Sequence, residues 1–189
     1  HTTCFSFTVA KLMTTIEGGC ITTNDEQIYK KLNQIRNVGR DGPGQYVHHV
    51  IGSNYRFTDL QAVLGIHQLK QLDQFVSQRI KIAEKYENGI NTLTFQQTPD
   101  YVTTHPHMLF FAFSENQEKR DKNLKFLRDS GIDARLPYMP INIQPCNPEL
   151  QIFNSPHASD IFERSFTLPI YNNMTNDECD FVIDFCNKL

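Results

Sequence analysis

Residues 4–19 read CFSFTVAKLMTTIEGG and set one lysine, Lys11, between an aromatic, apolar run and a Glu-Gly-Gly turn. Aromatic and β-branched residues favour strands, so residues 4–9 and 19–23 are predicted to be two short strands joined by a loop through Lys11. A lysine attacks a carbonyl only when its amine is unprotonated, which burial or neighbouring positive charge brings about. The residues that precede Lys11 are mostly apolar, which suits such a role. The alternative is an ordinary exposed loop lysine.

The composition is that of a soluble globular protein. Hydrophobic residues make up 39% and charged residues 21% of the 189 residues, and the formal net charge is -3. This balance gives no reason to expect binding to nucleic acid or to an anionic membrane. No apolar run reaches the length of a membrane span and no signal peptide is apparent, so we expect a cytoplasmic protein.

The five cysteines predict reduced thiols. Their number is odd and they form no CxxC pair, which is typical of a protein in a reducing compartment. Cys179 and Cys186 are seven residues apart, a spacing that suits one buried helix face. The histidines at 105 and 107 lack acidic or thiol residues at ligand spacing, so no metal site is expected.

The first part of the chain alternates strands and helices. TNDE, residues 23–26, has the spacing of a capping box and predicts a helix that ends at Gly39. Another helix should begin near Thr58 or Asp59. Its apolar periodicity continues from Leu60 to Leu93, and we expect a break near Leu72–Asp73 because a single helix of that length is unusual in a globular protein.

Beyond Pro99 the pattern changes. MLFFAF (108–113) and GIDARL (131–136) are predicted strands, with a helix at 116–129 between them, and a proline-bearing ordered loop follows. The last segment is an amphipathic helix whose capping box is Thr175 and Glu178. Together the elements indicate an α/β or α+β protein with two domains, residues 1–73 and 74–189.

Several blocks of the chain resemble one known family. They are CFSFTVAK, EGGCITTND, RNVGRDG, GSNYRFTDLQAVLGIHQLKQLDQFVSQRIKIAEKY, GIDARLPYMPINIQP and FTLPIYNNMTNDE, and they span almost all 189 residues. In this order the sequence is similar to the carboxy-terminal half of the DegT/DnrJ/EryC1/StrS family of nucleotide-sugar aminotransferases. The resemblance implies the α/β class: part of a fold-type I, aspartate aminotransferase-like large domain, followed by an α+β small domain.

The resemblance also implies a cofactor, pyridoxal 5'-phosphate, and roles for three residues. Lys11 matches the lysine that binds the cofactor covalently and moves a proton on the substrate. Ser6 matches a hydroxyl that contacts the cofactor phosphate. Asn54 matches an asparagine that reaches the phosphate of the neighbouring subunit, which implies a homodimer with shared active sites. From the residues alone, Asn54 in GSNYR is equally a turn residue.

Four further residues are candidates for substrate binding: Arg40, Arg56, Tyr138 and Asn142. The forked donors of Arg40 and Arg56 suit the phosphates of a sugar nucleotide, although a structural or solvated arginine is an equal alternative. Asn142 stands in a loop, PINIQP, where relatives often carry histidine.

The implied function is that of a fragment. The family's upstream half supplies the acidic partner of the pyridine nitrogen and an aromatic residue that stacks on the ring, so we expect this chain alone to be inactive. The complete enzyme would transfer an amino group from glutamate to a keto-sugar nucleotide in sugar or cell-surface polysaccharide biosynthesis. The alternatives are a non-catalytic remnant or assembly module of the same fold, and a relative with other chemistry on the same cofactor.

Overall fold

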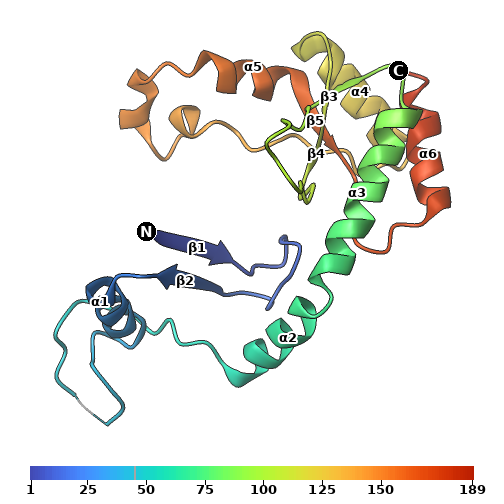
Figure 1. Ribbon diagram of the computed structural model, residues 1–189. Coiled ribbons are helices and arrows are strands. Elements are labelled where there is room, and N and C mark those ends of the chain that lie inside the picture. The colour runs from blue at the N-terminus through green and yellow to red at the C-terminus, as the bar shows by residue number, and fades with distance from the viewer. Residues whose placement is uncertain (45) are drawn as a thin grey trace. The chain divides into compact units, whose positions relative to one another are not determined.

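The structure, a computed structural model, describes residues 1–44 and 46–189. The chain divides into two compact units, His1–Asp73 and Gln74–Leu189, each described by itself below (Figure 1). Within the described residues, no helix combines the length and the apolar character that crossing a bilayer requires.

The first unit begins with a β-hairpin. Strands β1 (Thr2–Ser6) and β2 (Gly19–Thr23) pair antiparallel, from Thr2 opposite Thr23 to Ser6 opposite Gly19. The prediction for β2 is confirmed, whereas β1 ends at Ser6 rather than at residue 9. It ends there because the next carbonyl, that of Phe7, accepts hydrogen bonds from the Thr15 amide and the Thr14 hydroxyl, which bend the chain into a loop.

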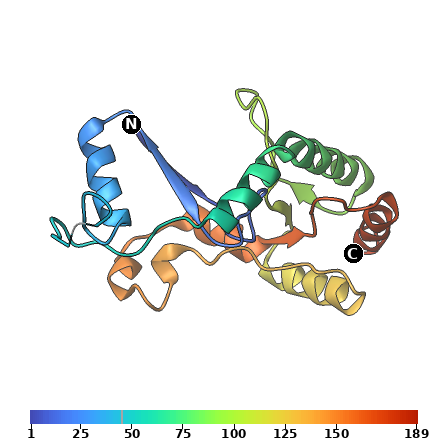
Figure 2. The same ribbon diagram turned by 90° about the horizontal axis from the view of Figure 1, so that it is seen from below.

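Helix α1 (Glu26–Arg36) lies beside the hairpin (Figures 1 and 2). The predicted cap was wrong: Asp25, not Thr23, accepts from the amides of Gln27 and Ile28 at 2.8 and 3.0 Å. A carboxylate immediately before the helix is a better partner for these free amides than a hydroxyl two residues further away. The helix also ends before the predicted Gly39, because the chain turns away at Val38 and Gly39, both with positive φ.

The predicted break in the long helical segment is confirmed. Helix α2 (Asp59–Leu69) begins at Thr58, whose side chain forms a capping box with Gln61, and α3 (Leu72–Gly89) begins three residues after α2 ends. Short capped helices are stabilised mainly by packing of one face. Neither α1 nor α2 has a buried residue within this structure.

The second unit contains a three-stranded antiparallel sheet in the order β3-β4-β5. Strand β4 (Phe110–Phe113) lies inside the predicted MLFFAF strand, while β3 (Thr94–Phe95) and β5 (Ser165–Leu168) were not anticipated. The predicted strand GIDARL was wrong: Arg135 alone forms a bridge, to Thr167. A bond from the Ala134 amide to the Ile132 carbonyl, 2.8 Å, turns this segment and prevents a ladder.

Helices surround this sheet. They are α3, α4 (Gln117–Asp129), α5 (Pro156–Arg164) and α6 (Asn176–Cys186), with short 3-10 turns at Ile141–Ile143 and Pro148–Ile152. The capping box of α6 is confirmed, with Thr175 accepting from the Glu178 amide. α3 packs closely on α6, because a side chain in place of Gly89 would meet Ile183.

The hydrophobic core lies entirely in the second unit. Its buried members come from α3, α4, α6, the sheet and the segments that follow α3 and α4, and include Cys179 and Cys186, as their spacing predicted. In the described part of the first unit, by contrast, only Thr15 and Gly39 are buried. Large apolar side chains there remain in solvent, among them Ile51 at 100% and Leu60 at 85% exposure.

Candidate functional site

The loop that joins β1 to β2 is closed at its base. The Phe7 amide donates to the Gly18 carbonyl and the Thr15 amide donates to the Phe7 carbonyl, both at 2.9 Å. The Thr14 hydroxyl donates to the same Phe7 carbonyl at 3.0 Å. These bonds fix the two ends of the loop, so the residues between them are presented on a defined turn.

Lys11 lies within this loop. Its amide donates to the Thr8 carbonyl at 3.0 Å, which makes a turn immediately before the side chain, and the residue is half-buried. The Thr8 hydroxyl in turn donates to Glu17 Oε1 at 3.0 Å across the loop. The backbone therefore holds the lysine, and its partial burial reduces the solvation of an ammonium group.

Helix α2 supports the far side of the loop. Gln61 Nε2 donates to the Glu17 carbonyl at 2.6 Å, and the Thr14 amide donates to Gln68 Oε1 at 3.4 Å. Gly18 adopts φ +143°, and a Cβ there would lie 2.5 Å from the Phe57 ring. A residue without a side chain is therefore required where the loop meets the segment that precedes α2.

Ser6 is the last residue of β1 and lies opposite Gly19, with its side chain exposed. Strand geometry places the side chain of Phe5 on the face opposite to that of Ser6. The hydroxyl thus stands at the strand end on the opposite side from the Phe5 ring, five residues before the lysine.

Asn54 is placed by the end of α1. It forms a bridge with Asn37, and the neighbouring Tyr55 amide donates to the Arg36 carbonyl at 3.0 Å. The Asn54 side chain is exposed, and its Oδ1 accepts a long bond, 3.4 Å, from the Arg56 amide. Its amide NH₂ group has no hydrogen bond to the described residues.

Asn54 and Arg56 line a cavity of about 1180 Å³ in the first unit. Phe5, Phe7 and Ile21 of the hairpin contribute to its wall, and the wall is mainly apolar. Neither Ser6 nor Lys11 lines it. The structure therefore places Ser6 at the end of β1 and Lys11 in the loop that follows it, whereas Asn54 and Arg56 together line a cavity to which neither contributes.

The remaining predicted residues lie apart. The guanidinium of Arg40 stands 5.7 Å from the centre of the Tyr46 ring. In the second unit, Tyr138 is 74% exposed, and Asn142 is buried and donates to the Phe153 carbonyl at 3.0 Å. Asn142 thus holds its own loop together within the structure, whereas Tyr138 presents its ring to solvent.

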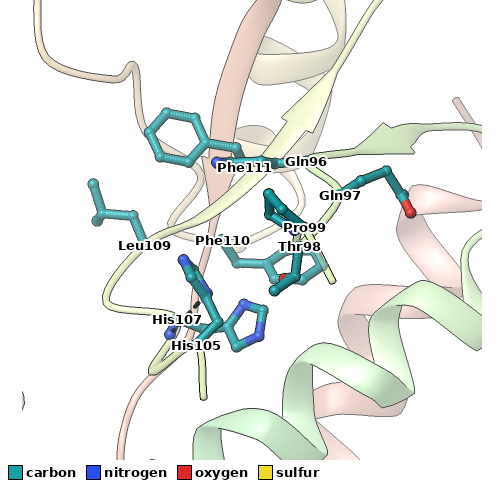
Figure 3. A pocket seen from close by; sticks show the side chains of 9 residues that line it. All are labelled: Gln96, Gln97, Thr98, Pro99, His105, His107, Leu109, Phe110 and Phe111. Atoms are coloured by element: carbon teal, nitrogen blue, oxygen red, sulfur yellow. Dashed lines mark hydrogen bonds between the residues drawn. The ribbon is translucent and has the colours of Figure 1, made fainter. Parts of the chain in front are cut away.

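A small cavity of the second unit, about 30 Å³, has two histidines among the residues that line it (Figure 3). The rings of His105 and His107 meet edge to face, 4.4 Å between centres, and the His107 amide donates to His105 Nδ1 at 3.4 Å. Burial first, and then the neighbouring imidazole, lowers the pKa of His107 below its ordinary value. A cavity of this size suits a water molecule and not a substrate.

The sequence interpretation missed several residues of the first unit. Tyr29, Lys30, Asn33 and Arg36 share one stretch of α1 and line a second cavity with Arg56. Their spacing of three and four residues is the one indication in the sequence that they share a helix face. No group of three or more histidine, cysteine, aspartate or glutamate residues suited to a metal ion occurs among the described residues.

Comparison with curated proteins finds relatives with sugar-related names. The chain is 30% identical over 184 residues to GDP-perosamine synthase of Escherichia coli O157:H7, covering 97% of this chain and 50% of that protein. It is 29% identical over 206 residues to the spore coat polysaccharide biosynthesis protein SpsC of Bacillus subtilis, covering 96% and 52%. The chain thus spans about half the length of these relatives.

Solved structures share the fold. Spr1654 of Streptococcus pneumoniae, a sugar aminotransferase by name and solved in its PMP form, superposes with a TM-score of 0.89 at 25% identity, covering 99% of this chain and 50% of that one. PseC of Helicobacter pylori, an aminotransferase of pseudoaminic acid biosynthesis, superposes with a TM-score of 0.88 at 23% identity, covering 99% and 52%.

The match to a family model decides the assignment. The model of the DegT/DnrJ/EryC1/StrS aminotransferase family matches residues 1–187, nearly the whole chain. The α/β class and the motifs around Lys11 and Asn54 agree with this match. The chain belongs to the DegT/DnrJ/EryC1/StrS aminotransferase family.

Proposed function

We propose that this chain is part of an aminotransferase that uses pyridoxal 5'-phosphate and transfers an amino group from glutamate to a keto-sugar nucleotide. The family membership and the names of the relatives support the reaction class. The observation that carries the proposal is the closed loop of the first unit, which presents one half-buried lysine, Lys11.

Residues of the hairpin and its loop fit the cofactor. The Lys11 amine is the group that would hold it covalently, and the Ser6 hydroxyl is available to donate to its phosphate. When bound, the cofactor supplies an electron sink for the substrate carbon. The loop keeps Lys11 in position through the Phe7, Thr15 and Gly18 backbone bonds, so its amine can give and take a proton at one fixed place.

The placement of Asn54 supports a dimer with shared sites. Its side chain lines a cavity to which neither Ser6 nor Lys11 of the same chain contributes. A contact between Asn54 and the cofactor phosphate is therefore best made in a second copy of the protein. Under this proposal the homodimer is the functional unit, and each subunit contributes its Asn54 to the active site of the other.

We assign the unit His1–Asp73 to the cofactor-binding large domain and Gln74–Leu189 to the small domain. The second unit has a core of its own, while the first exposes most of its apolar side chains, as a part of a larger domain would. Arg56 and Tyr138 remain candidates for direct substrate contact. Arg40 is kept as a weaker one, and Asn142 acts as a positioning residue of its loop.

The five cysteines are all unpaired, which supports a cytoplasmic location, because disulfides are rare in that compartment. Exposed Cys4 and Cys20 belong to neighbouring strands but are offset by one residue in register. They therefore point to opposite faces of the hairpin and are not placed for a disulfide.

The test is reduction with borohydride in the presence of pyridoxal 5'-phosphate, on the full-length protein that carries this chain. We expect one pyridoxyl group per chain, located on Lys11 by peptide mapping, and none in Lys11→Arg. Lys31→Arg, a change on the exposed face of α1, serves as the control and should label normally. A protein that binds no cofactor would be the non-catalytic module, and a label on another lysine would overturn the assignment of Lys11.

A further inference from the structure

One residue of the loop that carries Lys11 has a strained backbone. Ile16 adopts φ +72°, a conformation that is an outlier for a β-branched residue. The Ile16 side chain is 63% exposed, so its own packing does not account for the strain. Backbone strain of this kind persists only where the surrounding structure enforces it, and it is concentrated at functional sites.

Two threonines enforce the turn at Ile16. The Thr14 hydroxyl oxygen accepts from the Ile16 amide at 2.9 Å, and the same hydroxyl donates to the Phe7 carbonyl at 3.0 Å. The Thr15 side chain is 1% exposed, and its hydroxyl donates to the Glu17 carbonyl at 2.9 Å. These bonds fix the backbone on both sides of Ile16 and so set the direction of the Glu17 side chain.

Helix α2 holds the same turn from outside the loop. Gln61 Nε2 donates to the Glu17 carbonyl at 2.6 Å, which gives this carbonyl a second donor besides the Thr15 hydroxyl. A Cβ at Gly65 of α2 would lie 3.0 Å from the Thr15 methyl group, so the helix approaches Thr15 closely. The Glu17 backbone is therefore held by the loop and by the helix.

The Glu17 side chain crosses the loop to Thr8. Thr8 Oγ1 donates to Glu17 Oε1 at 3.0 Å, and the Thr8 carbonyl accepts from the Lys11 amide, also at 3.0 Å. An ionised carboxylate is a stronger acceptor for a hydroxyl than a neutral oxygen is. Two hydrogen bonds in series thus lead from the Glu17 carboxylate, through Thr8, to the backbone of Lys11.

We propose that Glu17 is a positioning residue for Lys11. Its carboxylate, directed by the turn at Ile16, holds the Thr8 hydroxyl, and this contact keeps the turn between Thr8 and Lys11 closed. The Lys11 amine then reaches a carbonyl from one fixed direction. The proposal rests on the proposed function, in which this carbonyl is the aldehyde of the cofactor, and it adds two residues, Glu17 and Thr8, that act through Lys11.

The experiment measures how fast Lys11 takes up pyridoxal 5'-phosphate in the full-length protein, by borohydride trapping at successive times and mapping of the labelled peptide. Attachment joins the Lys11 nitrogen to the aldehyde carbon with release of one water molecule, and borohydride reduces the new bond. We expect Glu17→Ala and Thr8→Val each to slow attachment by roughly 2- to 13-fold, the factor for loss of one hydrogen bond. The double variant should be no slower than either single variant, because both changes remove the same contact.

Conservative variants separate positioning from charge. Glu17→Gln and Thr8→Ser keep an acceptor and a donor, so both should attach the cofactor at the wild-type rate. Glu115→Ala, which changes an exposed glutamate of the second unit, is the control and should also match wild type. Slow attachment in Glu17→Gln would overturn the proposal, because the negative charge and not the hydrogen bond would then matter. Unchanged attachment in Glu17→Ala would overturn it as well.

Hydrogen exchange without cofactor is an independent measurement on the same proteins. The Lys11 amide should exchange faster in Glu17→Ala and Thr8→Val, and at the wild-type rate in Glu17→Gln. Circular dichroism of each variant controls for folding. A wild-type protein that takes up no cofactor refutes the proposed function, and exchange of the Lys11 amide then decides by itself whether Glu17 holds this turn.

Discussion

Lys11, Ser6 and Asn54 could be proposed as site residues from the sequence because each stands in a short local motif. The backbone bonds that close the loop around Lys11 all lie within residues 7–18, and the side chains of Gln61 and Gln68 of α2 add support from outside it. The cavity that residues of α1 line with Arg56 was not predicted, because it forms only when the end of α1 meets the segment around Arg56, nineteen residues after Asn37. The spacing of residues along a helix indicates which side chains share a face. It does not indicate which other segment of the chain packs against that face.

At Asn54 we predict a loss of cofactor with little loss of fold. Asn54→Ala removes an exposed amide whose one described side-chain bond is long, so the stability of the unit should change by less than about 1 kcal/mol. Its proposed phosphate contact is worth about 1.5–3 kcal/mol, so cofactor dissociation constants from absorbance titration should rise roughly 10- to 150-fold. Asn24→Ala, also exposed, is the matched control. An unchanged cofactor affinity would mean that Asn54 is a turn residue and does not contact the cofactor phosphate.

At His107 we predict a dependence of stability on pH. Its pKa is lowered in the folded state, so the folded protein binds fewer protons than the unfolded chain near pH 6. The contribution of His107 to the free energy of unfolding is present above the ordinary histidine pKa of about 6.5 and is lost as the pH falls below it. Urea unfolding at pH 7.5 and 5.5 should show a larger loss in the wild type than in His107→Gln.

His157→Gln removes an exposed histidine from the same unit and should keep the wild-type pH dependence. The neighbouring His105, in edge-to-face contact, is the second cause of the lowered pKa of His107, because two adjacent imidazolium ions repel each other. Identical pH profiles for wild type and His107→Gln would contradict this account.

At the scale of elements, helix starts were predicted better than strands. The start of α2 near Thr58 and the capping box of α6 were both predicted, the second because a hydroxyl residue and its partner stand three apart, whereas the capping box of α2 was not anticipated. At α1 the same spacing misled, since Asp25 lay closer to the free amides. Strand β5 was missed because its four residues, SFTL, are all buried and lack the alternation of a half-exposed strand.

For α6 we predict that Thr175→Ala lowers stability by about 1 kcal/mol, within the usual range of 0.5–2 for loss of an N-cap. The Thr175 side chain accepts from the Glu178 amide, and Glu178 Oε2 accepts from the Thr175 amide at 2.7 Å. Thermal or urea unfolding measures the change. Thr103→Ala, an exposed loop threonine, should differ from wild type by less than half of that amount, and equal losses would contradict the role of the cap.

At the scale of the whole molecule, the two units differ in whether each contains a hydrophobic core of its own. The second buries Tyr86, Phe110 and Phe166 in a continuous cluster with residues from three helices and the sheet. The first has a hairpin and two helices without one buried apolar side chain in its described residues. The sequence indicated these helices except α5, and it could not indicate burial, which depends on what surrounds each face.

We therefore predict that residues 74–189 fold cooperatively as an isolated fragment and that residues 1–73 do not. Dispersed amide signals and a sigmoidal urea transition are expected for 74–189, and light scattering should show association for 1–73 and for the 189-residue chain. The 189-residue chain should also lack aminotransferase turnover with glutamate and keto-sugar nucleotides. A monodisperse, active chain would contradict this prediction.

The buried Arg79 of α3 has a consequence for how the protein is made. Its guanidinium donates to the Asn172 side chain and to the carbonyls of His107 and Ile170, at 3.0–3.1 Å. The second and third of these partners lie 28 and 91 residues further along the chain. At a synthesis rate of about 5–20 residues per second, α3 waits on the order of 10 s for Ile170 to leave the ribosome. During that interval the apolar face of α3 and the unpaired guanidinium of Arg79 are exposed and can be bound by chaperones. The rate of translation across residues 80–170 should therefore govern the yield of folded protein.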